Sequence, residues 1–146
     1  MIGLLTWVQP SHRQRDRKLY IKSRVTEHYV ERSHVLLGRT VDGGRIRDVV
    51  AVAKHLRDKH QGAVPVHLCG RRGAAILAAY AALQDARRIA GVTAIDPPAS
   101  HMEPDAPQLL NVLRVCDIPD VLGMLAPRPL TIHGQAADWE KVVQIY

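Results

Sequence analysis

The segment 64–86 constrains the fold more than any other part of the sequence. It opens with the β-branched run VPVHLC, continues through the small-residue turn GRRGAA, and ends in the almost wholly apolar run AAILAAYAALQDA. This order predicts a strand at 64–69, a tight turn, and a helix at 74–86. Because that helix is apolar nearly all round, it has to lie buried between other layers.

The remainder of the chain alternates predicted strands with predicted helices. Strands alternating with helices favour a parallel sheet joined by right-handed crossovers. The pattern therefore predicts an α/β fold class with a mostly parallel sheet of about four strands. Besides 64–69, strands are predicted at 2–8, 89–96 and 128–134; helices are predicted at 25–37, 45–60, 109–115, 118–125 and 136–146, and loops at 38–44 and 99–108.

Composition sets limits on the core and on partners. A chain of 146 residues suits one domain, and with aromatics at 4% and no Phe the core has to be aliphatic. The predicted helix 45–60 supplies an apolar face at helical spacing. The formal net charge is +6, but the basic stretch 12–24 contains Asp16 and lacks the interleaved aromatics of a nucleic-acid stacking surface. We interpret it as a solvated face and expect no nucleic-acid partner. The apolar face of the predicted helix 45–60 consists of Ile46, Val49, Val50, Ala53 and Leu56.

The spacing of the two cysteines and the character of the N-terminal residues indicate whether the chain binds a metal and where in the cell it lies. Cys69 and Cys116 lie far apart, without metal-ligand spacing or a disulfide framework, and are interpreted as small buried hydrophobes. The N-terminal apolar run is too short to span a membrane and lacks the basic region of a signal peptide. The sequence predicts no metal, no cofactor, no membrane contact and a cytoplasmic location.

The turn after the predicted strand 64–69 has the small-residue frame of a nucleophile elbow, whose pattern is G-x-S-x-G. Here the nucleophile position holds Arg72, and a guanidinium stays protonated and cannot attack an ester carbonyl. An elbow nucleophile also has a strained backbone, so we expect this turn to relax, with Gly73 taking any positive φ. Neither Cys69 nor Ser100 is a convincing replacement. The five residues that align with the G-x-S-x-G pattern are Gly70, Arg71, Arg72, Gly73 and Ala74.

The two arginines suggest an alternative use of the same turn. A turn that opens a helix presents free N–H groups to anions, and Arg71 and Arg72 would strengthen the attraction. Asp96, at the end of the next predicted strand, could then contact a ribose. The dinucleotide pattern G-x-G-x-x-G is incomplete, however. The alternatives are therefore a binding site for a carboxylate, phosphate or sugar acid, and two arginines that simply face solvent.

Two flanking segments resemble a known family. Residues 35–56, which contain LLGRT followed by GGRIRD, resemble the stretch before the nucleophile strand in α/β-hydrolases of the acetyl xylan esterase and dienelactone hydrolase-like group. Residues 110–134, which contain APRPL, resemble that group's approach to the strand before its catalytic acid. The resemblance implies one truncated hydrolase-like domain over 1–146, family-like at 35–138 and poorly matched at 1–34. The implied architecture is part of a three-layer sandwich.

The resemblance also implies that the site is incomplete. The family's serine corresponds to Arg72, its acid corresponds to Asp138, and its catalytic histidine would follow beyond Tyr146. His133 is interpreted as structural. We therefore expect a catalytically inactive relative of ester hydrolases, whose ligand would be a small ester or an acidic molecule. A reduced sheet would expose an apolar edge, which leaves three alternatives: a chain that is unstable alone, a homodimer formed through that edge, or a gene fragment or mispredicted reading frame.

Overall fold

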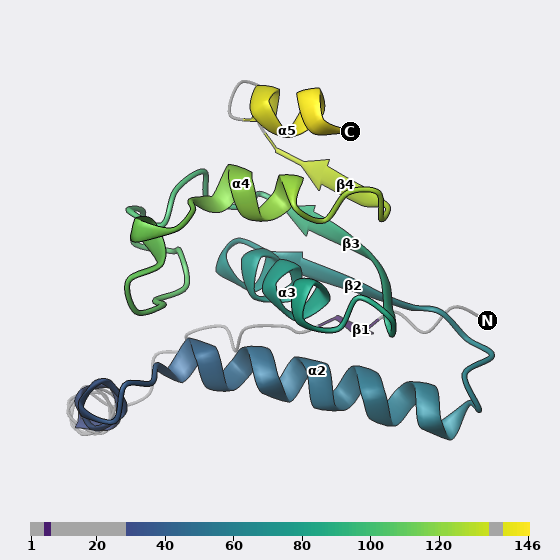
Figure 1. Ribbon diagram of the computed structural model, residues 1–146, viewed down its shortest axis with the longest axis horizontal. Helices are drawn as coiled ribbons and strands as arrows, with labels where there is room; N and C mark the ends of the chain where they lie inside the picture. Colours follow the sequence, from purple (N-terminus) through teal and green to yellow (C-terminus); the bar gives the residue numbers. More distant parts are fainter. Residues whose placement is uncertain (1–4, 7–28, 135–138) are drawn as a thin grey trace, which may run out of the picture.

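The computed structural model describes residues 5–6, 29–134 and 139–146. It belongs to the α/β class, as predicted. Helix and strand alternate from α2 to β4, and Figure 1 shows them laid out from the foot of the view to the top. The elements are a helix at 29–36, β1 (Leu5–Thr6), α2 (Val41–Lys59), β2 (Val66–Arg71), α3 (Gly73–Gln84), β3 (Ile89–Ile95), the 3-10 turn η1 (Val112–Arg114), α4 (Ile118–Gly123), β4 (Leu130–His133) and α5 (Glu140–Ile145).

The sheet is parallel throughout its described strands, and each strand pairs with the next one along the chain. The strand order is β1-β2-β3-β4, with the two-residue β1 beside β2. Leu68 lies opposite Val92, which in turn lies opposite Leu130. The three side chains therefore point to one face of the sheet, because side chains alternate along a strand.

That face carries the core. Helices α2, α3 and α4 contribute to one continuous cluster with Val66, Leu68 and Val92 of the sheet, and Figure 1 shows α3 and α4 lying over the strands. The cluster consists almost entirely of Ala, Val, Leu and Ile, joined by Trp139, which confirms the predicted aliphatic core. Helix α3 is buried along most of its length, as its apolar composition requires.

The predicted apolar face of α2 is also confirmed. Ile46 and Ala53 are buried, and the other three members of the face pack against the core. The helix nevertheless begins at Val41, inside the stretch predicted to be a loop. Thr40 caps it by accepting a hydrogen bond from the Gly43 N–H at 2.9 Å, and Asp42 lies in its first turn, where a carboxylate is favoured.

Other boundaries differ from prediction at the ends of elements. Strand β2 starts two residues later than expected and runs on through Gly70 and Arg71. Four other predicted elements are shorter in the structure: 109–115 becomes η1, 118–125 becomes α4, 128–134 becomes β4, and 136–146 becomes α5. Of the elements predicted at 2–8 and 25–37, the structure describes only Leu5–Thr6 and 29–36.

Cys69 and Cys116 are free thiols and half-buried, so they are less enclosed than the sequence suggested. Within the described ranges, His, Cys, Asp and Glu form no group of three that could hold a metal ion. None of the helices described is both long and apolar enough to cross a bilayer. The basic stretch 12–24 lies outside the described residues.

We predict that Gly70→Ala destabilises the protein by about 1–3 kcal/mol, because the methyl group would overlap backbone atoms. A Cβ at position 70 would lie 2.5 Å from the Ala74 carbonyl oxygen and 2.6 Å from the Ala75 Cα. Urea unfolding measures the change.

Gly44→Ala is the matched control for this prediction. Position 44 lies within α2 with open space around its missing side chain. Alanine there should stabilise the protein by about 0.5–1 kcal/mol, because glycine weakens a helix. Equal effects of the two substitutions would contradict the close passage of β2 and α3.

Candidate functional site

The turn between β2 and α3, called the elbow below, has a strained backbone at Arg72. Arg72 separates the two elements and has φ 54° and ψ −133°. The expectation that the turn relaxes through Gly73 is wrong, because Gly73 is already the first residue of α3 and has no positive φ. Two backbone hydrogen bonds hold Arg72: its N–H donates to the Ile95 carbonyl and its carbonyl accepts from the Ala75 N–H, both at 2.9 Å.

Close packing on both sides explains why the turn cannot relax. Gly70 lies against the backbone of Ala74 and Ala75, and Gly73 lies against the carbonyl of Asp105. Neither glycine leaves room for a side chain. The predicted frame of small residues is therefore confirmed, and its role is to let strand, helix and the loop at 99–108 approach one another.

Both arginines of the turn are paired with carboxylates. Arg71 Nε and Nη2 donate to Asp96 Oδ2 at 3.3 and 3.2 Å, which joins the ends of β2 and β3. Arg72 Nη2 lies 3.3 Å from Asp105 Oδ2, which joins the elbow to the loop. All four side chains are more than half exposed, so each pair contributes little, about 0–1 kcal/mol. An added anion at this turn would compete with these two carboxylates.

Asp96 and His133 meet at the same rim of the sheet. The Asp96 N–H donates to the His133 carbonyl at 2.6 Å, and Asp96 has a positive φ of 45°. The structure thus brings Arg71 and Asp96 together as an ion pair. Asp138, the candidate acid, lies outside the described residues.

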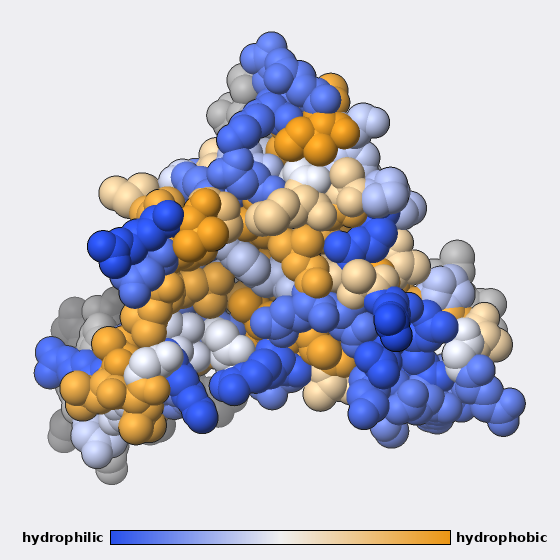
Figure 2. Space-filling view, in the orientation of Figure 1, coloured by the Kyte–Doolittle hydropathy of each residue, from blue (hydrophilic) through white to orange (hydrophobic). Residues whose placement is uncertain are grey.

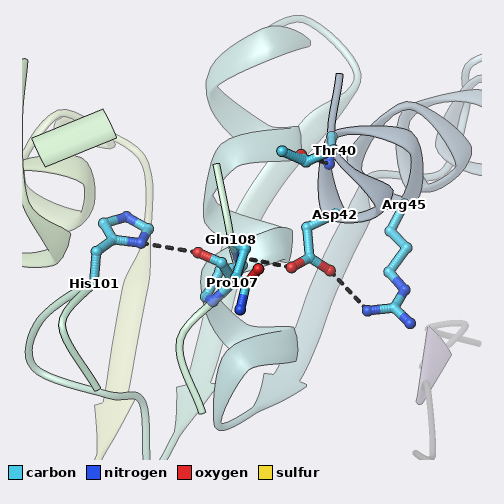
Figure 3. Close-up of polar contacts among 7 residues, drawn as sticks. Thr40, Asp42, Arg45, His101, Pro107 and Gln108 are labelled. Atoms are coloured by element: carbon cyan, nitrogen blue, oxygen red, sulfur yellow. Dashed lines mark hydrogen bonds and ion pairs between the residues drawn. The ribbon is translucent and has the colours of Figure 1, made fainter. Parts of the chain in front are cut away.

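A polar cleft of about 280 Å³ opens beside the elbow. Its walls come from the helix at 29–36, the start of α2, the turn after β2 with the first residues of α3, and the loop at 104–108. Asp42 holds the cleft together: one oxygen accepts from Arg45 Nη1 and the other from the Gln108 N–H, both at 2.7 Å (Figure 3). Its side chain is only 14% exposed, so this carboxylate is committed to structure.

A second polar network ties the loop after β3 to α4. Asp117 caps α4 and accepts hydrogen bonds from Ser100 Oγ at 2.7 Å and from the N–H groups of His101 and Ile118 at 2.8 Å. Burial opposes the charged form of Asp117, but these hydrogen bonds outweigh it and lower the pKa of the carboxyl. Ser100 therefore donates its proton to a carboxylate whose lowered pKa makes it a weak base, which leaves it without the base that a nucleophilic serine needs.

His101 is likewise committed to packing. Its Nδ1 lies 3.1 Å from the Pro107 carbonyl oxygen, which can only accept, so Nδ1 carries a proton. In the neutral ring Nε2 then accepts from the Tyr80 hydroxyl at 2.9 Å. Burial is the main cause of the raised pKa of Tyr80. This histidine fastens the loop to α3 instead of facing Arg72.

Sequence reasoning missed Asp42, Gln108 and Asp117, although two of them left a signal. Thr40 and Asp42 form a helix-start pattern, which the following pair of glycines obscured. The run DIPD at 117–120 reads as a capping box with proline in the first turn. Gln108 binds through its backbone, for which a sequence carries no residue-specific signal.

Comparison with family models, curated proteins and solved structures finds no match to this chain.

We predict that Arg72→Gly is more stable than Arg72→Ala by about 1 kcal/mol, because only glycine adopts this φ without strain. Both variants lose the exposed pair with Asp105, so their difference isolates the backbone. Arg47, exposed within α2, is the control: there the alanine variant should be the more stable by about 0.5–1 kcal/mol. The same order of stability at both positions, in chemical denaturation, would show that the elbow is not strained.

Asp117→Ala should cost about 1–2 kcal/mol at neutral pH, the value of a helix cap. Because the folded pKa lies below the unfolded one, this stability is present above about pH 4 and lost as the pH falls through the folded pKa. The difference between wild type and variant should therefore shrink in acid. Asp58→Ala, on the exposed surface of α2, is the control and should show little cost. A cost for Asp117→Ala that persists unchanged to pH 2 would refute the role of the charged carboxylate.

Proposed function

We propose that this chain is a catalytically inactive α/β-hydrolase-like domain, related to the acetyl xylan esterase and dienelactone hydrolase-like group of ester hydrolases. The observation that carries the proposal is Arg72, which holds an elbow backbone with φ 54° and ψ −133° at the turn from a parallel strand to a buried helix. In that group a serine occupies this position. The likeness thus lies in the geometry of the turn as well as in the flanking sequence.

The chemistry of the site supports the inactive half of the proposal. A guanidinium offers five donors and no lone pair with which to attack a carbonyl. Arg72 instead pairs with Asp105 across the cleft. The nearest alternative nucleophile in the loop, Ser100, donates its proton to a carboxylate of lowered pKa. Nothing in these contacts prepares an oxygen for acyl transfer.

We also propose that the parallel sheet is part of a hydrolase sandwich of about four strands, in which a second helical layer covers the other face. Helices described here cover one face of the sheet. The opposite face carries His67, half-buried and bonded to Thr93 Oγ1 at 3.0 Å, together with the half-buried Cys69. Parallel sheets are ordinarily covered on both faces, which supports this architecture.

The proposal predicts that a fluorophosphonate probe leaves the protein unmodified. Protein first shown to melt cooperatively is incubated with the probe, and intact mass is measured. We expect no adduct under conditions that fully label an active serine esterase. Hydrolysis of 4-nitrophenyl acetate should run no faster than in buffer, because no described group activates a nucleophile at the elbow.

Ser100→Ala is the matched control for this labelling. A stoichiometric adduct on the wild type, absent in Ser100→Ala, would show an activated serine and overturn the proposal. Stabilisation by phosphate or acetate that disappears in Arg71→Ala and Arg72→Ala would instead favour the anion-binding alternative.

A further inference from the structure

A second cavity adjoins the polar cleft and has the opposite character. It has a volume of about 200 Å³ and lies between α2, β2 and α3. Its lining is mostly aliphatic and includes Val49 and Val52 of α2, Leu68 of β2 and Leu77 of α3. Arg45, Ala74 and Leu77 line both the cavity and the cleft, so the two spaces meet at these residues.

Small side chains on α3 account for the space. Ala74 and Ala78 are one helical turn apart and line the cavity with single methyl groups. The facing residue of α2, Val52, is 44% exposed and does not close the gap. An apolar cavity of about 150 Å³ suffices to bind benzene, so this volume admits a ring with a short substituent.

Arg45 supplies hydrogen-bond donors where the cavity meets the cleft. Among the described residues Arg45 donates one hydrogen bond, from Nη1 to Asp42, and its side chain is 51% exposed. A guanidinium has five N–H donors, so several remain for a ligand. Figure 3 shows Asp42 between Arg45 and Gln108, and the hydrogen bond from Nη1 to Asp42 holds the guanidinium end of the arginine side chain at the cleft.

Charged groups of both signs surround the cavity and the cleft. Asp48 lines the cavity, the carboxylates of Glu31, Asp42 and Asp105 line the cleft, and so do the guanidinium groups of Arg45 and Arg72. Because Asp42 is paired with Arg45 and Asp105 with Arg72, an ionised head group of either sign would have to compete with one of these partners or face a like charge. A neutral acceptor oxygen meets neither penalty.

We propose that the cavity between α2 and α3 binds a small neutral molecule with an apolar body and one acceptor oxygen, such as an alcohol, ketone or ester. The apolar body lies against Leu68 and Leu77, and the oxygen accepts from Arg45. This binding does not depend on whether the elbow is catalytically inactive.

The test compares four probes of similar shape by NMR titration of the full chain: benzyl alcohol, toluene, benzoate and benzylamine. We expect saturable binding of benzyl alcohol with roughly millimolar affinity. Toluene should bind several-fold more weakly, and benzoate and benzylamine at least about tenfold more weakly. Absence of saturable benzyl alcohol binding, or tighter binding of either charged probe, would overturn the proposal.

Two variants locate the site. Val52→Phe should fill the cavity and weaken benzyl alcohol binding at least about tenfold, whereas Val143→Phe, at a 72% exposed position of α5, should leave it unchanged. Arg45→Met should reduce benzyl alcohol to the affinity of toluene without changing toluene. Unaltered binding in folded Val52→Phe would refute the location.

Discussion

The passage of β2 against the start of α3 is the contact on which the rest of the rim depends. Gly70 allows the strand to lie against the backbone of Ala74 and Ala75. With strand and helix so close, the single residue between them has to turn sharply, which forces Arg72 to a positive φ. Its side chain then points across to Asp105 and not along the sheet. The close contact between β2 and α3 therefore determines the backbone conformation of Arg72, the direction of its charged side chain and the ion pair with the loop at Asp105.

Helix α2 is held to this rim by its first turn and shapes both neighbouring spaces. Asp42 connects the helix to the loop through the Gln108 N–H, so the polar cleft has a defined wall. Farther along, α2 meets the alanine side of α3, where short side chains leave the apolar cavity. The same pair of helices thus presents a charged surface at one end and an aliphatic one beside it.

Much of the fold could be predicted because it follows from local patterns. The buried alanine-rich helix and the apolar face of α2 both come from periodicity, which burial then enforces. The start of α2 could not be placed, because the two glycines at 43 and 44 oppose a helix locally while the Thr40 cap and the contact with Gln108 favour it. The elbow was misjudged for a related reason. The sequence shows that a positive φ at Arg72 would be strained. It does not show the packing of Gly73 against Asp105 that imposes this strain, because that contact joins residues far apart in the chain.

The strand order has a consequence for how the chain acquires its structure. Each described strand pairs with the strand that follows it in sequence, and a helix between successive strands packs on the same core. From β2 to β4 the sheet contacts therefore join strands separated by one crossover, whereas Leu5 of β1 pairs with Leu68 across a much longer stretch of chain and a larger loop has to close. During synthesis the β2-α3-β3 unit can form before β4 has left the ribosome, and each later strand then adds to an edge that already exists.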